Sequence, residues 1–136
     1  MVKEIKIGGK KCRLKSSAAV LRAYRMTFGE DLIVGMNNMF QYIMLQKKLN
    51  VELKAQAEAS NTEFEPVNTG ITSEHIKTLE NFLYILHKQG DPNQPDNIDD
   101  WLDQFGLSDI YEAFPTVIDI WLAENKQVAS AKKKKE

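Results

Sequence analysis

Few residues in this sequence are of types that could do chemistry, and their spacing does not bring them together. The two histidines, His75 and His87, are twelve residues apart in one predicted helix. This separates them by about 18 Å along its axis, too far to share a metal ion. The single cysteine, Cys12, could be a nucleophile, but it alternates with Leu14 in a predicted strand, which favours a small buried apolar residue. Because neither HExxH nor CxxC occurs, we expect no enzymatic activity, no metal and no cofactor.

Two further groups resemble ligand-binding motifs without having their spacing. The GGKK segment at residues 8–11 lacks the GxxxxGK(S/T) pattern of a phosphate-binding loop and fits a tight hairpin turn. Asp99, Asp100 and Asp103 could form a carboxylate cluster, but only Asp99 and Asp103 share one face of a helix. The calcium-loop pattern is absent as well. These acids indicate either a solvated face or a docking face for a basic partner.

Composition indicates one globular domain in a reducing compartment. The 136 residues are 43% hydrophobic and 27% charged, a globular balance in a chain long enough to bury a core. No apolar run approaches the roughly 18 residues that span a bilayer, and the N-terminus lacks the apolar stretch of a signal peptide. One cysteine cannot form an internal disulfide. The sequence therefore predicts a cytoplasmic protein that does not enter a membrane.

Charge is distributed unevenly along the chain. Residues 1–25 carry eight Lys or Arg and one acid, whereas residues 91–125 carry nine Asp or Glu and no basic residue. Four lysines follow at residues 132–135. Each stretch could be a solvated face. Alternatively, a basic end of one copy could meet an acidic end of another, which would give head-to-tail self-association through charge-opposed ends.

Apolar periodicity predicts a mainly α fold with a short N-terminal β-hairpin, about five helices and a disordered basic C-terminal tail. Alternating residues around the Gly-Gly pair predict the hairpin. Gly29 suits the end of the first helix, and Glu30 or Asp31 suits the start of the second. Pro115 predicts a break or a kink near Phe114 in the last helical region. The predicted parts are a single helical domain at residues 1–126, a mobile loop within it at about 55–72, and a disordered Lys-rich tail at 127–136.

The second predicted helix carries a broad apolar stripe that is rich in methionine. Methionine is flexible and polarizable, and adaptable binding surfaces use it. Ordinary core packing is the alternative, and an exposed apolar patch would distinguish the two. The stripe consists of Met36, Met39, Phe40, Ile43 and Met44.

Two stretches of the chain resemble a known family. They are LRAYR at residues 21–25 followed by FGEDL at 28–32, and FPTVI at 114–118 followed by Trp121. Together they resemble the tail assembly chaperones of long-tailed phages and prophages of Gram-positive hosts. The resemblance runs along the whole chain and is most specific in an LRxYRxxFGxDL pattern. The residues of that pattern are Leu21, Arg22, Tyr24, Arg25, Phe28, Gly29, Asp31 and Leu32.

The resemblance implies a small helical protein that binds the tape measure protein and recruits the tail tube protein during tail morphogenesis. Such proteins are made in the host cytoplasm and are absent from the mature virion. The methionine-rich stripe would then be an apolar groove for the tape measure protein. Many of these chaperones also have a longer form made by ribosomal frameshifting. The lysines at 132–135 could reflect a slippery run of adenines or a solubilising tail, which the gene would distinguish.

Two other functions compete with this interpretation. A small DNA-binding regulator would use the basic N-terminus, but a pI of about 6.1 and the absence of a predicted recognition helix argue against nucleic acid as the partner. A structural tail or head–tail component would remain in the particle, where a chaperone would be missing.

Overall fold

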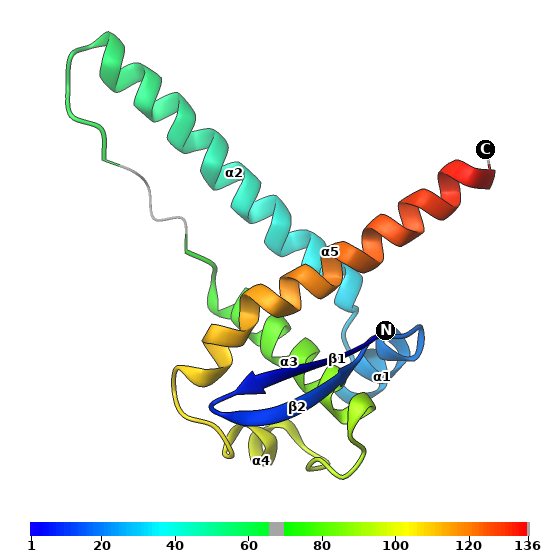
Figure 1. Ribbon diagram of the computed structural model, residues 1–136. Coiled ribbons are helices and arrows are strands. Elements are labelled where there is room, and N and C mark those ends of the chain that lie inside the picture. Colours follow the sequence, from blue (N-terminus) through cyan, green and yellow to red (C-terminus); the bar gives the residue numbers. More distant parts are fainter. Residues whose placement is uncertain (66–69, 136) are drawn as a thin grey trace.

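Helix α3 lies at the centre of the fold, and the other elements pack around it (Figure 1). The computed structural model describes residues 1–65 and 70–135, with side chains up to residue 125. Its elements are β1 (Val2–Ile7), β2 (Lys10–Lys15), α1 (Ala19–Phe28), α2 (Leu32–Ala59), α3 (Ser73–Gly90), α4 (Ile98–Leu102) and α5 (Asp109–Lys135). Buried side chains occur on all sides of α3 between Thr78 and His87, as expected of a helix enclosed by neighbours. The hairpin followed by helices confirms the predicted fold class.

The N-terminal hairpin packs one face on α3 and leaves the other exposed. Gly8 and Gly9 have φ angles of 58° and 81°, which is the geometry of a primed two-residue turn. The inner face buries Ile7, Cys12 and Leu14, residues that alternate along the strands as predicted. Successive side chains of a strand point to opposite faces. The residues between the buried ones therefore lie on the outer face, and most of them are polar.

The corner between α1 and α2 is built by the LRxYRxxFGxDL pattern. Gly29 ends α1 with a left-handed φ of 69°, where the lack of a Cβ avoids strain. Asp31 caps α2, and its Oδ1 accepts a hydrogen bond from the Ile33 amide at 2.8 Å. Tyr24 and Leu32 are buried on either side of this corner, and the Tyr24 and Phe28 rings lie 5.1 Å apart. We call the elements that pack around α3 the body of the protein. The pattern therefore fixes the angle at which α2 leaves the body.

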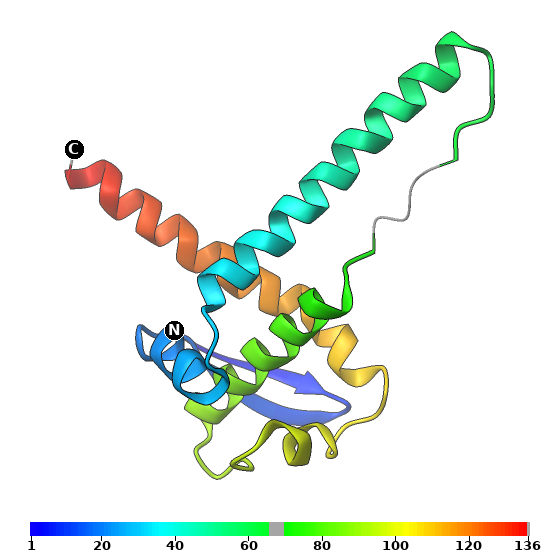
Figure 2. The same cartoon turned by 180° about the vertical axis from the view of Figure 1, so that it is seen from behind.

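Helices α2 and α5 both extend beyond the other elements and diverge from each other (Figures 1 and 2). Helix α2 is longer than predicted, because residues 55–59 of the expected loop are helical. Their sequence, AQAEA, consists of strong helix formers. The connection to α3 therefore begins at Ser60, and its residues 66–69 lie outside the described part. Among the described residues, no helix has both the length and the apolar character needed to cross a bilayer.

Helix α5 continues through Pro115, so of the two predicted outcomes the break near Phe114 is wrong, while the kink stays a prediction. Proline removes one backbone N–H and displaces the carbonyl four residues earlier, which belongs to Tyr111. Pro115 and Tyr111 are both exposed, so water can satisfy that carbonyl while the opposite side of the helix stays packed. The helix reaches Lys135. The predicted disordered tail at 127–136 falls on residues whose side chains are outside the described part.

Candidate interaction site on helix α2

The histidines have structural partners and do not meet at a common site. His75 belongs to a capping box at the start of α3, where its Nδ1 accepts a hydrogen bond from the Thr72 amide at 3.2 Å. His87 is buried near the other end of α3, and its Nδ1 accepts a hydrogen bond from Trp101 Nε1 at 2.9 Å. Across the described residues, no three His, Cys, Asp or Glu side chains are grouped so that they could hold a metal ion.

The pair of His87 and Trp101 joins α4 to α3, and no pattern in the sequence predicted this contact. Burial lowers the pKa of the His87 ring, although the nearby charge of Asp91 opposes this. A neutral ring leaves Nδ1 free to accept the indole proton. The Trp101 ring also lies 5.5 Å from the Tyr84 ring and 5.1 Å from the Phe105 ring. The pair therefore stabilises the short α4 helix, and both of its side chains are buried.

Cys12 is buried beneath the hairpin, as its alternation with Leu14 predicted. Burial raises the pKa of its thiol. A thiol that stays protonated and inaccessible is a poor nucleophile. Cys12 therefore acts as a small apolar residue of the core.

The basic and acidic stretches are neighbours in the fold, although they lie far apart in the sequence. Lys10, in the hairpin, donates a hydrogen bond to the Gln104 carbonyl at 3.3 Å and lies 5.7 Å from the centre of the Phe105 ring. On the outer hairpin face, Lys6 stands directly opposite Lys11. Asp99, Asp100 and Asp103 are exposed on or beside α4. A contact between copies through these charges would have to join two adjacent surfaces rather than two opposite ends.

The LRxYRxxFGxDL pattern separates into packed and exposed residues. Tyr24, Phe28, Gly29, Asp31 and Leu32 build the corner described above. The other three lie on the exposed or partly exposed side of α1: Leu21, Arg22 and Arg25. The pattern thus accounts for local structure at most of its positions.

The predicted apolar groove is corrected by the structure. Met36 and Met39 are fully buried against the core, and Phe40 and Ile43 are half-buried against it. Of the five predicted residues only Met44 is exposed, with 69% of its surface accessible. The first half of α2 therefore packs as core, because its methionines fill the space beside α3 and α1.

The second half of α2, residues 44–59, projects from the body, and we call it the arm (Figures 1 and 2). The large apolar residues of the core-facing stripe end at Ile43, because the next positions are polar: Gln46 is half-buried and Lys47 is exposed. The arm nevertheless keeps large apolar side chains in water. Leu45 and Val51 are 66% and 69% exposed, and Leu49 is 40% exposed.

Apolar residues lie on two nearly opposite sides of α2. Successive residues are turned by about 100°, so Leu49 and Val51 point about 160° apart. The leucine face consists of Leu45, Leu49 and Leu53, and the methionine face consists of Ile33, Phe40, Met44 and Val51. A helix that is apolar on several sides is normally buried by neighbours. The returning chain borders the leucine face at the tip and the start of α3 borders it at the base, whereas Met44 and Val51 are largely exposed, so the methionine face of the arm is the candidate interaction site.

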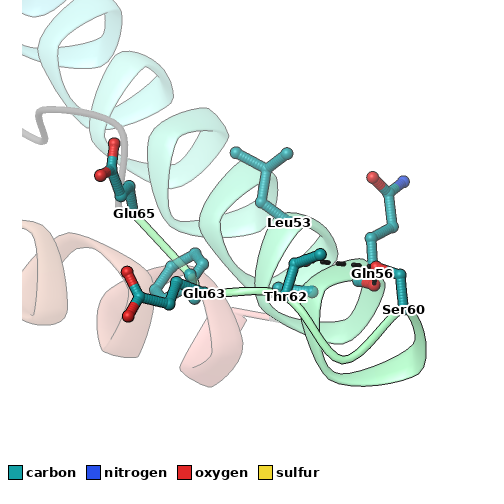
Figure 3. A pocket seen from close by; sticks show the side chains of 8 residues that line it. Leu53, Gln56, Ser60, Thr62, Glu63 and Glu65 are labelled. Carbon is teal, nitrogen blue, oxygen red and sulfur yellow. Dashed lines mark hydrogen bonds between the residues drawn. The ribbon is translucent and has the colours of Figure 1, made fainter.

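Two shallow hollows mark the ends of the leucine face. At the tip, the returning chain from Ser60 to Glu65 lies beside α2 and leaves a hollow of about 300 Å³ that Leu53 and Ala57 border (Figure 3). At the base, a hollow of about 430 Å³ lies between the starts of α2 and α3 and is bordered by Val34, Asn38 and His75, among others. The hollow at the base is also lined by Glu30, Asp31, Glu74 and Thr78.

The arm's exposed face was only partly visible in the sequence. The four-residue spacing of Leu45, Leu49 and Leu53 extends the predicted helix, but periodicity alone does not say which apolar residues a core will reach. The change to lysine at positions 47 and 54 is the signal that could have distinguished the apolar residues that reach the core from those that do not. These lysines interrupt the stripe that begins with Met36 and Met39.

Comparison with known proteins gives no relative for this chain, since no family model, curated protein or solved structure matches it. Any functional conclusion therefore comes from the residues and their arrangement.

Proposed function

We propose that this protein is a tail assembly chaperone of a long-tailed phage or prophage of a Gram-positive host. It would bind the tape measure protein in the host cytoplasm, recruit the tail tube protein while the tail is built, and leave before the virion is complete. The family resemblance suggests this role, and one structural observation supports it. That observation is an arm of about four helical turns that holds large apolar side chains in water.

The methionine face is the surface that we assign to the tape measure protein. Met44 and Val51 are the most exposed large apolar residues of the arm, and Phe40 continues the face toward the body. An amphipathic target helix can lay its apolar side along such a face, with contacts repeating every three or four residues. Methionine adapts to targets of different shape. This set replaces the predicted groove, since Met36 and Met39 serve the core.

Weak binding by each copy suits this role. A long target with many apolar segments can hold many copies, and the total affinity then grows through multivalency without a tight individual contact. Each copy can also be displaced when the tube protein covers the target. Binding of this kind needs no catalytic group in the chaperone.

The test is co-expression with the tape measure protein of the same genome. We expect the tape measure protein to become soluble and to co-purify with this chain. Met44→Lys should reduce the co-purified amount about tenfold, because a lysine on the apolar face must be desolvated on binding. Gln41→Lys adds the same charge at an exposed position outside both faces and should have little effect. Unchanged solubility of the tape measure protein would contradict the proposal, and retention of the chain in purified virions would indicate a structural component.

Duplex DNA is a second candidate partner, and the outer face of the hairpin is the observation that favours it. Lys6, Lys11, Arg13 and Lys15 are all exposed there, with Glu4 as the acid on that face. A DNA-binding protein would lose affinity by a factor of about 10³ or more between 50 and 200 mM salt. Fluorescence anisotropy with labelled duplex DNA would measure this. No binding at 50 mM salt would exclude the regulator.

A further inference from the structure

Three exposed lysines of the arm lie beside the methionine face. Met44 and Val51 are seven residues apart, which is about 10.5 Å along the helix axis, and they point in directions about 20° apart. Lys47 and Lys54 have the same spacing and lie about 60° to one side of Met44 and Val51, respectively. Lys48 lies about 40° to the other side of Met44. The apolar stripe therefore runs between positively charged side chains.

The two flanks of this stripe differ in charge. On the first flank, Lys47 and Lys54 come before any acid, and Glu58 follows them at the tip of the arm. On the second flank, Glu52 follows Lys48 by four residues. The described part of the chain contains two ion pairs, and neither involves a residue of the arm. The first flank is thus positive from Met44 to Lys54, and its lysines are available to a partner.

The methionine face is turned away from the connection between α2 and α3. Leu53 and Ala57, which border the hollow beside the returning chain, point about 180° and 140° away from Met44. Met44 and Val51 are both 69% exposed. The described elements therefore leave the stripe and its flanks accessible.

A narrow apolar stripe with lysines beside it restricts what can bind there. A helix that lies in an anionic membrane surface normally has a broad apolar face with Trp, Phe or Leu, whereas the arm exposes two large residues on this side. Duplex DNA would be held through its phosphates and would leave Met44 and Val51 unused. An amphipathic helix can use both features, with apolar residues on the stripe and carboxylates beside Lys47 and Lys54.

We propose that the methionine face binds an amphipathic helix whose apolar stripe has carboxylates along one flank, about seven residues apart. Two helices that pack side by side stay in register over two turns, so carboxylates with this spacing can each lie opposite one lysine. Such charges contribute more to the choice of partner than to affinity. The inference rests on the proposed function, because it gives the chemistry of the tape measure segment that this face would hold.

Binding of synthetic peptides to the full chain tests this chemistry without the tape measure protein. Three labelled amphipathic peptides of about 20 residues share a leucine stripe and carry glutamate, glutamine or lysine at seven-residue intervals on one flank. In fluorescence anisotropy at low salt, the glutamate peptide should bind about fivefold to tenfold tighter than the glutamine peptide, and the lysine peptide should bind most weakly. At about 1 M salt, where charges are strongly screened, the three affinities should converge.

A charge-reversed variant identifies the surface that is responsible. In the arm variant, Lys47→Glu combined with Lys54→Glu, the lysine peptide should bind more tightly than the glutamate peptide. Lys3→Glu combined with Arg22→Glu makes the same change in net charge at exposed positions outside the arm and should keep the original order. Circular dichroism would show whether both variants fold, and the comparison of the three peptides on the wild type needs no variant.

Three results would overturn the proposal. Equal affinity of the three peptides at low salt would mean that the lysines do not select an acidic helix. Absence of binding by all three would mean that the stripe does not accept an amphipathic helix. Tighter binding of phosphatidylglycerol vesicles or duplex DNA than of the glutamate peptide, lost in the arm variant, would assign these lysines to phosphate groups.

Failure of this inference and failure of the proposed function give different results. If the tape measure protein co-purifies equally with the arm variant and the wild type but is lost in Met44→Lys, the acidic flank is wrong and the proposed function is supported. If the tape measure protein stays insoluble in every co-expression while the glutamate peptide binds most tightly, the proposed function is wrong and the chemistry of the face is supported.

Discussion

Helices α3 and α2 each carry several leucines, but these leucines have opposite surroundings. In α3, Leu79, Leu83 and Leu86 are fully buried because the hairpin and the other helices enclose it. In the arm of α2, Leu45 and Leu49 are exposed because this part of α2 extends beyond the other elements. The two regions differ in whether this chain alone supplies the surface that covers their leucines. In the arm, the described part of the chain leaves Leu45 and Leu49 exposed.

A matched pair of leucine substitutions tests this difference most strongly. Leu83→Ala should lower the free energy of unfolding by about 2–5 kcal/mol, because it leaves a cavity in a packed core. Leu45→Ala should change it by less than about 0.5 kcal/mol, because the side chain is already in water. Urea denaturation followed by circular dichroism measures both. Similar losses in the two variants would mean that the arm is packed within the monomer.

The end of α3 offers a second test of how closely the body is packed. A Cβ at Gly90 would collide with the carbonyl oxygen of Arg13 in the hairpin. Gly90→Ala should therefore cost about 1–3 kcal/mol, as overpacking does. Gln89→Ala, one position earlier, should cost less than about 0.5 kcal/mol. Thermal unfolding of the two variants would compare them, and a Gly90→Ala protein as stable as the wild type would show that hairpin and helix can separate freely.

Acid should weaken the body through His87. Burial lowers the pKa of this ring in the folded state, so the unfolded state binds more protons below its own pKa of about 6.5. The stabilisation is therefore complete above pH 6.5 and is lost as the pH falls toward the lowered value, by at most about 1.4 kcal/mol per pH unit.

Urea denaturation between pH 7.5 and 5.5 would measure this slope. In His87→Gln, whose amide carbonyl can still accept the Trp101 proton, the slope should be flatter. The same slope in the variant and the wild type would assign the acid sensitivity to other groups.

Removing the Asp31 cap at the start of α2 should have the smallest of these effects on the free energy of unfolding. Asp31→Ala removes the acceptor of the Ile33 amide and should cost about 1 kcal/mol, whereas Asp31→Asn keeps a capping oxygen and should cost much less. Chemical denaturation of both variants would measure the difference. Equal costs would mean that the carboxylate acts through its charge and not as a cap.

The sequence predicted the elements well where local chemistry determines them. The Gly-Gly turn, Gly29 as the end of α1 and Asp31 as a cap follow from residues whose backbone or capping preferences are strong. At Pro115 the predicted break is wrong and the alternative, a kink, stays a prediction; the helix continues because proline is tolerated when its missing hydrogen bond faces water.

The candidate site was less predictable, because burial depends on tertiary neighbours. Met36 and Met44 have the same residue type and belong to the same helix, yet one is fully buried and the other is exposed. Met44 lies about 80° around the helix from Met36, and the periodicity does not say which of these two sides the neighbouring elements cover. The partnership of His87 with Trp101 is likewise a contact between elements, fourteen residues apart.

Hydrogen–deuterium exchange of the co-expressed complex and of the dilute free protein tests the central claim most directly. We predict that amides of residues 44–59 exchange much faster than those of residues 79–87 in the free protein, because only a packed helix approaches the protection set by global unfolding. In the complex with the tape measure protein, the arm should gain protection while α3 stays unchanged. An arm as protected as α3 in the dilute free protein, or one that gains no protection in the complex, would contradict the account.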